Sequence, residues 1–266
     1  QLTPHYHYVS RPPFTEAEAV RRAIYLAGQT DTPLYIAHMT CREAIAELQK
    51  AKGTGQRVSG ETCTHYLTTT KEVLDNPDFN EAAKFVCSPA LRDQEDCEAL
   101  WQALAGGLLT AVSSDHCGID VAELKQAGRD DFTQIPNGSP GAGDRLHMVW
   151  TEGVCTGKLS RQKFVDVIAT QPAKINGIYP RKGTLAVGSD ADIVIFDPSY
   201  EGVIRLADNP NGVDYNLYEG HRQSGRVETV LLRGQVVVEN AKFVGRYGQG
   251  QFIPASMYAS GYENRN

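Results

Sequence analysis

The sequence lacks the features that mark membrane-spanning and nucleic-acid-binding proteins. No apolar run approaches the roughly 18–20 residues that are needed to cross a bilayer. The formal net charge is -6, and no cluster of lysine and arginine would provide a basic face for nucleic acid. A signal-peptide pattern, an internal repeat and a low-complexity segment are also missing. We therefore expect neither a membrane nor a nucleic acid as a partner.

Paired cysteines are missing as well. The chain has six cysteines in 266 residues, but they are scattered and form no CxxC motif. In a chain of this length the pattern is typical of reduced thiols rather than of a disulfide framework, so we predict a cytoplasmic protein. Cys87 and Cys117 end strand-like runs, where either a reactive thiol or a small buried apolar side chain would fit.

Strand-like and helix-like segments alternate over the first two-thirds of the chain. Short apolar runs predict strands at 33–37, 57–61, 85–87 and 108–114. Helical periodicity follows capping-box patterns at Thr15 and Thr40 and a candidate N-cap at Asp93. This order predicts an α/β fold with parallel strands covered by helices. About four strands fit the second half of an eight-stranded TIM (β/α)8 barrel better than a complete one, which needs roughly 250 residues.

The pattern changes along the rest of the chain. Residues 118–145 are rich in glycine and proline and predict a long loop, and loops of this length in compact domains are usually functional. Later segments are strand-like, with a hairpin at Gly234, and predict part of a small β domain. We therefore expect a barrel portion at 1–182, a β portion at 183–245 and a tail at 246–266.

Two predicted strands lead into a residue that can bind a metal. The run 33–37 precedes His38, and the run 108–114 precedes Asp115. In an α/β barrel the side chains just past the strands lie at the mouth, where the chemistry is done. Imidazole and carboxylate together suit zinc, so the pair indicates a hydrolytic metal site. The alternative is a hydrogen-bonded structural histidine and an aspartate that only caps the next helix.

A series of longer motifs extends over nearly the whole chain. These are YHYVSRPP at 6–13, LYIAHMTC at 34–41, GETC at 60–63, SPALR at 88–92, SDHC at 114–117, DFTQIPNG at 131–138, KGT at 182–184 and VGSDAD at 187–192. In this order and at these separations they resemble the dihydropyrimidinase and hydantoinase branch of the amidohydrolase superfamily. The resemblance implies the second half of a metal-bearing TIM barrel followed by part of a β-sandwich, that is, the C-terminal portion of a longer enzyme.

The resemblance also implies roles for four residues. His38 would be a ligand of the second zinc, and Asp115 would bind the first zinc and shuttle the proton. The main chain at Ser88 and Asn137 would recognise the amide edge of a cyclic substrate. Family members hold two zinc ions per complete subunit, bridged by a carbamylated lysine that this chain does not contain. They act on a small cyclic amide or imide and form homotetramers or homodimers, with the tail against a neighbouring subunit.

The implied reaction is hydrolytic ring opening of a cyclic amide or imide, such as dihydrouracil or a 5-substituted hydantoin. Zinc-activated hydroxide would attack the ring, with Asp115 as general base and then general acid. The first-half motifs of the family, including a His-x-His pair, are absent. His5 and His7 form a similar pattern, but no strand leads into it. We therefore expect this chain to need the missing N-terminal half, and to be inactive alone.

Two other functions remain open on the sequence. Allantoinase opens a related ring with a similar site. A non-catalytic scaffold related to the collapsin response mediators would keep the fold but lack metal ligands, and the retention of His38 and Asp115 argues against it. His116 could support a metal ligand or face outward beside Asp115, and His65 could line the mouth or be structural.

Overall fold

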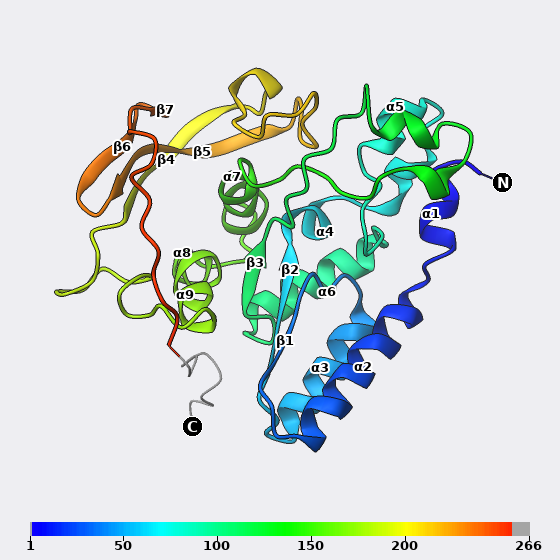
Figure 1. The fold of residues 1–266 in the computed structure, drawn as a ribbon, viewed down its shortest axis with the longest axis horizontal. Helices are drawn as coiled ribbons and strands as arrows, with labels where there is room; N and C mark the ends of the chain where they lie inside the picture. Colours follow the sequence, from blue (N-terminus) through cyan, green and yellow to red (C-terminus); the bar gives the residue numbers. More distant parts are fainter. Residues whose placement is uncertain (1, 257–266) are drawn as a thin grey trace.

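The computed structural model describes residues 2–256, in which two separate sheets are formed (Figure 1). The first is a parallel sheet with the order β1-β2-β3, and the second is antiparallel with the order β4-β5-β6-β7. The strands are β1 (Leu34–Ile36), β2 (Val58–Cys63), β3 (Ala111–Ser113), β4 (Ile193–Val203), β5 (Arg222–Leu232), β6 (Gln235–Glu239) and β7 (Lys242–Phe243).

Helices cover the parallel sheet and occupy the connections between strands. The α-helices are α1 (His5–Val9), α2 (Pro13–Gln29), α3 (Arg42–Gly53), α4 (Thr64–Thr68), α5 (Phe79–Ala83), α6 (Gln94–Ala105), α7 (Arg145–Val149), α8 (Arg161–Val165) and α9 (Gln171–Ile175). Other helical turns are η1 (Lys71–Asp75), η2 (Lys125–Gly128), η3 (Phe132–Gln134), η4 (Trp150–Val154), η5 (Asp166–Thr170) and η6 (Leu206–Asp208). Within the described chain, none of these helices is long and apolar enough to cross a membrane.

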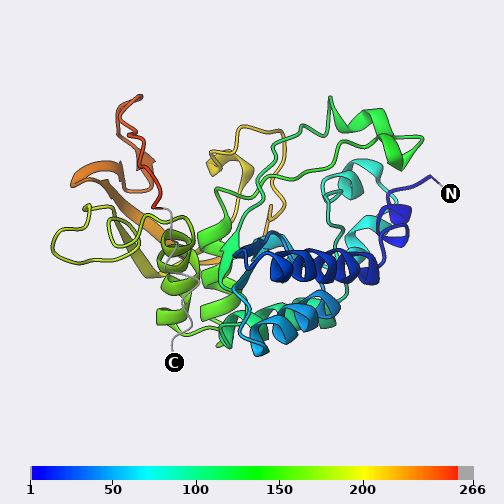
Figure 2. The same cartoon turned by 60° about the horizontal axis from the view of Figure 1, so that its bottom comes forward.

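The crossovers explain why the first sheet is parallel. α3 lies in the connection from β1 to β2, and α6 lies in the connection from β2 to β3, as parallel pairing requires. α2 and α3 lie side by side (Figure 2). A Cβ at Gly60 would lie 2.6 Å from Met39 Sδ and 3.1 Å from Leu48 Cδ2. The chain beyond β1 and helix α3 can therefore pack closely on β2 only because position 60 has no side chain.

One predicted strand is wrong. Residues 85–87 form no strand, so the described parallel sheet has three strands rather than about four. The carbonyl of Val86 accepts hydrogen bonds from Lys125 Nζ and from the main-chain N–H of Gly138. These partners belong to the long loop, so the apolar segment is held by the loop and not by a neighbouring strand.

The predicted capping boxes are also wrong. Helix α2 begins at Pro13, before Thr15, whose hydroxyl donates to a main-chain carbonyl. Glu16 instead accepts from the main-chain N–H of Thr40 at 2.8 Å and from its hydroxyl. Asp93 is the N-cap residue of α6 but forms an ion pair with a lysine rather than a capping bond. These polar side chains connect different elements, and the capping pattern considers only one helix at a time.

The antiparallel sheet contains the predicted hairpin. Leu232 pairs with Gln235, and the two residues between them, Arg233 and Gly234, have φ of 49° and 77°. Positive φ at both central residues is the geometry of a tight hairpin turn. Trp150 joins this sheet to the helices, because its ring centroid lies 4.8 Å from that of Phe196.

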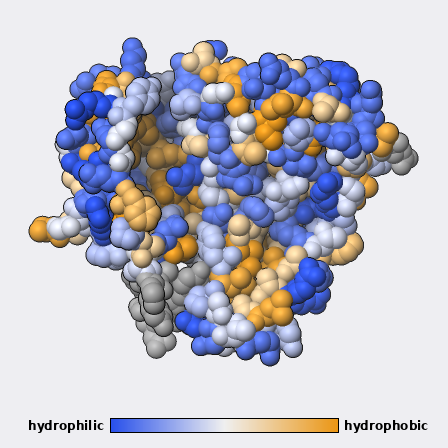
Figure 3. All heavy atoms as spheres, viewed as in Figure 1, coloured by the Kyte–Doolittle hydropathy of each residue, from blue (hydrophilic) through white to orange (hydrophobic). Residues whose placement is uncertain are grey.

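The face of the molecule drawn in Figure 3 mixes polar and apolar side chains. Apolar side chains gather below the centre of this face, around β1 and helices α2 and α3 (Figure 3). Parallel sheets of α/β proteins are normally covered on both faces. In this chain, helix α2 packs against β1 and helix α3 packs against β2.

Candidate active site

His38 and Asp115 follow the carboxyl ends of two parallel strands. His38 comes two residues after β1, and Asp115 comes two residues after β3, with β2 between these strands. Their φ angles are 39° and 43°, in the left-handed region. Such a backbone costs free energy in residues other than glycine and occurs often at functional sites. Both side chains therefore start from the same end of the sheet.

The donor types at these positions suit zinc, but the described chain provides only part of a ligand set. Asp115 is exposed and His38 is half-buried, and within residues 2–256 neither has a hydrogen-bond or ion-pair partner. Imidazole and carboxylate groups are common zinc ligands, so the side chains of His38 and Asp115 have suitable donor atoms. Within the same residues, no group of three or more His, Cys, Asp and Glu side chains could hold a metal ion. Further ligands would have to come from other protein.

His65 is buried just past β2. It follows Thr64, and within residues 2–256 its Nε2 atom has no hydrogen-bond partner. Burial, and to a smaller extent the nearby His38, lower the pKa of His65 to about 3. The ring is therefore neutral near pH 7. A buried ring nitrogen without a partner is unusual and is often explained by a group that binds beside it.

The structure brings Ser88 and Asn137 together. The hydroxyl of Ser88 donates a hydrogen bond to Asn137 Oδ1 over 3.0 Å, although the two residues are far apart in the sequence. Both side chains are exposed. The N–H of Gly138 donates to the carbonyl of Val86 at 3.0 Å, so the main chains beside the two residues are also bonded. The two segments therefore form one surface.

Gly138 connects this surface with the segment after Asp115. Its φ is 142°, and a Cβ there would lie 2.7 Å from both Cβ and Sγ of Cys117. Cys117 also donates its main-chain N–H to Ser139 at 3.0 Å. The segment with Asn137 can therefore lie against the segment that carries Asp115 only because position 138 is glycine.

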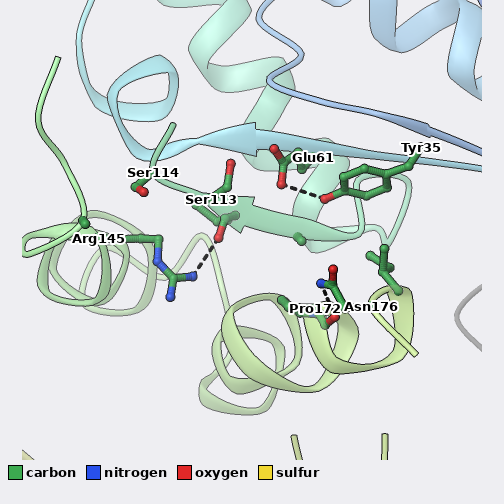
Figure 4. Close-up of a pocket in the computed structure, with 11 residues that line it drawn as sticks. Tyr35, Glu61, Ser113, Ser114, Arg145, Pro172 and Asn176 are labelled. Carbon is green, nitrogen blue, oxygen red and sulfur yellow. Dashed lines mark hydrogen bonds between the residues drawn. The ribbon is translucent and has the colours of Figure 1, made fainter. Parts of the chain in front are cut away.

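The sequence reasoning missed a polar pocket on the sheet face toward α9 (Figure 4). Tyr35 and Glu61 point toward one another, and the tyrosine hydroxyl donates to Glu61 Oε2 at 2.6 Å. Arg145 donates to the carbonyl of Val112 at 2.9 Å, and burial lowers the pKa of its guanidinium. Ser114, next to Asp115, lines the same pocket. The position of Glu61 in a strand could have suggested an inward polar side chain.

The remaining histidines and cysteines have separate environments. His116 is exposed, and its Nδ1 accepts the N–H of Gly141 at 3.3 Å. His7 is buried in α1, with Nε2 2.7 Å from the carbonyl oxygen of Cys87, so it is structural. All six cysteines are free thiols; Cys87 is buried, whereas Cys117 is exposed.

Comparison with known proteins identifies the family. The model of the amidohydrolase family matches residues 26–237. The D-hydantoinase of Ralstonia pickettii is 49% identical over 258 residues, which cover 97% of this chain and 56% of that protein. The dihydropyrimidinase of Arabidopsis thaliana is 40% identical over 257 residues, which cover 96% of this chain and 48% of that protein. The chain thus spans about half the length of the curated relatives it matches.

Solved structures agree with the sequence relatives. The crystal structure of dihydropyrimidinase from Brevibacillus agri NCHU1002 matches with a TM-score of 0.95 and 45% identity, covering 97% of this chain and 56% of that chain. L-Hydantoinase (dihydropyrimidinase) from Arthrobacter aurescens matches with a TM-score of 0.83 and 32% identity, covering 91% and 52%. The predicted fold class, half of a TIM barrel with part of a β-sandwich, is confirmed. The chain belongs to the amidohydrolase family, in its dihydropyrimidinase and hydantoinase branch.

Proposed function

We propose that this chain forms the C-terminal portion of a cyclic amidohydrolase that opens the ring of a dihydropyrimidine or a 5-substituted hydantoin by hydrolysis. The observation that carries the proposal is the shared placement of His38 and Asp115 past the ends of β1 and β3. The names of the matched relatives, D-hydantoinase and dihydropyrimidinase, support the same substrate class.

Asp115 would transfer the proton. As a general base it takes a proton from the attacking water, and the water oxygen forms a bond to the ring carbonyl carbon. The C–N bond of the ring then breaks, and the protonated Asp115 returns the proton to the leaving nitrogen. The products are a carboxylic acid, which releases its proton to solvent near neutral pH, and an open-chain nitrogen that has gained a hydrogen. The exposed position of Asp115 lets its carboxylate reach a bound ring.

Ser88 and Asn137 would orient the ring. Their main-chain groups offer donors and acceptors that match the –CO–NH– edge of a cyclic amide. The hydrogen bond between their side chains at 3.0 Å keeps the two segments at a fixed separation. Held in this way, the ring would be bound with similar strength before and during the reaction, so these contacts would contribute mainly to the affinity for the substrate.

The complete subunit would hold two zinc ions, with His38 as a ligand of the second and Asp115 as a ligand of the first. When bound, zinc would make water acidic enough to attack near neutral pH and would polarise the ring carbonyl. The remaining ligands, including a bridging carbamylated lysine, would come from the other half of the barrel. That half would also cover the open face of the parallel sheet, and we further propose a cytoplasmic homotetramer or homodimer.

A hydrolysis assay tests the proposal. The complete subunit, in which this chain is joined to or mixed with the N-terminal half of the barrel, is incubated with dihydrouracil, with hydantoin and with allantoin. We expect ring opening of dihydrouracil or hydantoin at roughly 1–1000 per second, and no measurable reaction by the 266-residue chain alone. A complete subunit that binds zinc but opens no ring would contradict the proposal and favour a scaffold. Preferential opening of allantoin would identify an allantoinase instead.

A further inference from the structure

Lys125 has a buried charged end that the proposed mechanism does not use. The residue lies in η2 of the long loop and is 0% exposed. Its Nζ donates to three main-chain carbonyls, those of Ala83 at 2.8 Å, Val86 at 3.2 Å and Gly138 at 2.7 Å. An ammonium group has three N–H donors, so each of them has a partner.

The bonded carbonyls flank the two residues that would recognise the substrate. Val86 comes two residues before Ser88, and Gly138 directly follows Asn137. Lys125 Nζ therefore connects the segment before Ser88 with the segment after Asn137. The neighbouring carbonyl of Cys87 lies 2.7 Å from His7 Nε2, so the segment before Ser88 is fixed from both sides.

Burial of the ammonium group of Lys125 reduces the free energy of unfolding. Within residues 2–256, Lys125 forms no ion pair, and the titratable groups nearest to it are the thiols of Cys87 and Cys117. Burial raises the pKa of Cys87 to about 11, so this thiol is neutral near pH 7. Burial lowers the pKa of Lys125 to about 8. A buried charge without an opposite charge costs free energy, and the three hydrogen bonds to main-chain carbonyls offset part of that cost. The ammonium is thus best explained by the geometry that its three hydrogen bonds impose.

We propose that Lys125 is a positioning residue for substrate recognition, which sets the separation of the main chains at Ser88 and Asn137. The inference rests on the proposed function, because it assigns those main chains to the cyclic amide. Lys125 does not touch the substrate in this account. It acts through the carbonyls of Val86 and Gly138.

The test compares Lys125→Met and Lys125→Gln with Lys52→Met in the complete subunit. Lys52 is a matched control, because it is also partly buried, its Nζ donates to the carbonyl of Leu108 at 2.8 Å, and burial lowers its pKa. It lies near the end of α3, at the opposite end of the sheet. Steady-state kinetics with the preferred ring give KM and kcat for each variant, and plasma mass spectrometry gives its zinc content.

We expect Lys125→Met to raise KM by roughly 10-fold or more, while kcat changes by less than about threefold and the zinc content is unchanged. Lys125→Gln keeps two N–H donors and should recover part of the loss. Lys52→Met should keep the wild-type KM. A wild-type KM in Lys125→Met, or an equal rise in Lys52→Met, would overturn the proposal.

Amide hydrogen exchange separates failure of this inference from failure of the proposed function. Even in a subunit that opens no ring, Lys125→Met should speed exchange at 86–88 and 137–139 by roughly 10-fold or more, and Lys52→Met should leave it unchanged. Unchanged exchange at both segments in Lys125→Met and Lys125→Gln would show that the lysine does not position them.

Discussion

Asp115→Asn should lower kcat/KM for ring opening by at least about 1000-fold in the complete subunit. Asparagine keeps the size of the side chain but cannot accept the proton from water. It also tolerates the left-handed backbone at this position, where φ is 43°, so the backbone is not newly strained. Because the carboxylate is exposed and has no hydrogen-bond partner within residues 2–256, the free energy of unfolding of the zinc-free protein should change by less than about 0.5 kcal/mol.

His116→Asn is the matched control for this variant. His116 is the next residue and is also exposed, but its ring only accepts main-chain N–H bonds, the nearer of them from Gly141. We expect its kcat/KM to stay within about threefold of wild-type, since we assign it no role in the reaction. Steady-state rates of the two variants and their chemical unfolding curves are compared. If Asp115→Asn retained more than about a tenth of the wild-type rate, Asp115 would not be the general base.

Arg92→Met should reduce the free energy of unfolding by about 3–5 kcal/mol. Arg92 is buried, and its guanidinium donates to Glu16 Oε2 at 3.1 Å and to the hydroxyl of Thr40 at 2.9 Å. Methionine fills much of the volume but leaves the carboxylate of Glu16 buried without an opposite charge. Because Glu16 also binds the N–H of Thr40, two residues after His38, the loss should loosen the chain that carries this histidine.

An exposed ion pair provides the control for Arg92. Arg222 lies 3.1 Å from Glu201, and both side chains are exposed to solvent. Arg222→Met should cost no more than about 1 kcal/mol. Urea unfolding followed by tryptophan fluorescence gives both values, since Trp101 of α6 lies in the core. If both variants lost the same free energy of unfolding, the buried contacts of Arg92 with Glu16 and Thr40 would stabilise the fold no more than an exposed ion pair does.

The strands that carry the site could be predicted, but the contacts of the loops could not. Apolar runs before His38 and Asp115 alternate with helical segments, and this local pattern is enough to predict parallel strands. The run at 85–87 has the same local pattern, yet the main chain there is bonded to Lys125 and Gly138. A local periodicity cannot predict hydrogen bonds to residues that are far away in the sequence.

The burial of Lys125 could not be predicted from the sequence either. Lysine is almost always exposed, so a lysine in a glycine-rich loop predicts a solvated side chain. The pairing of Ser88 with Asn137 came from the resemblance to a family, and the structure adds a 3.0 Å hydrogen bond between them. The inward direction of Glu61 follows from its place in β2, but no local pattern indicates that Tyr35 and Arg145 lie in the same pocket.

Zinc content per complete subunit, measured by plasma mass spectrometry for wild-type and His38→Asn side by side, tests the central claim most directly. Asparagine tolerates the left-handed φ of 39° at this position but is a poor zinc ligand. We predict about two zinc ions per wild-type subunit and about one or fewer in His38→Asn. Near-zero zinc in the wild-type after refolding with zinc and bicarbonate, or equal zinc in the two proteins, would contradict the assignment of this site.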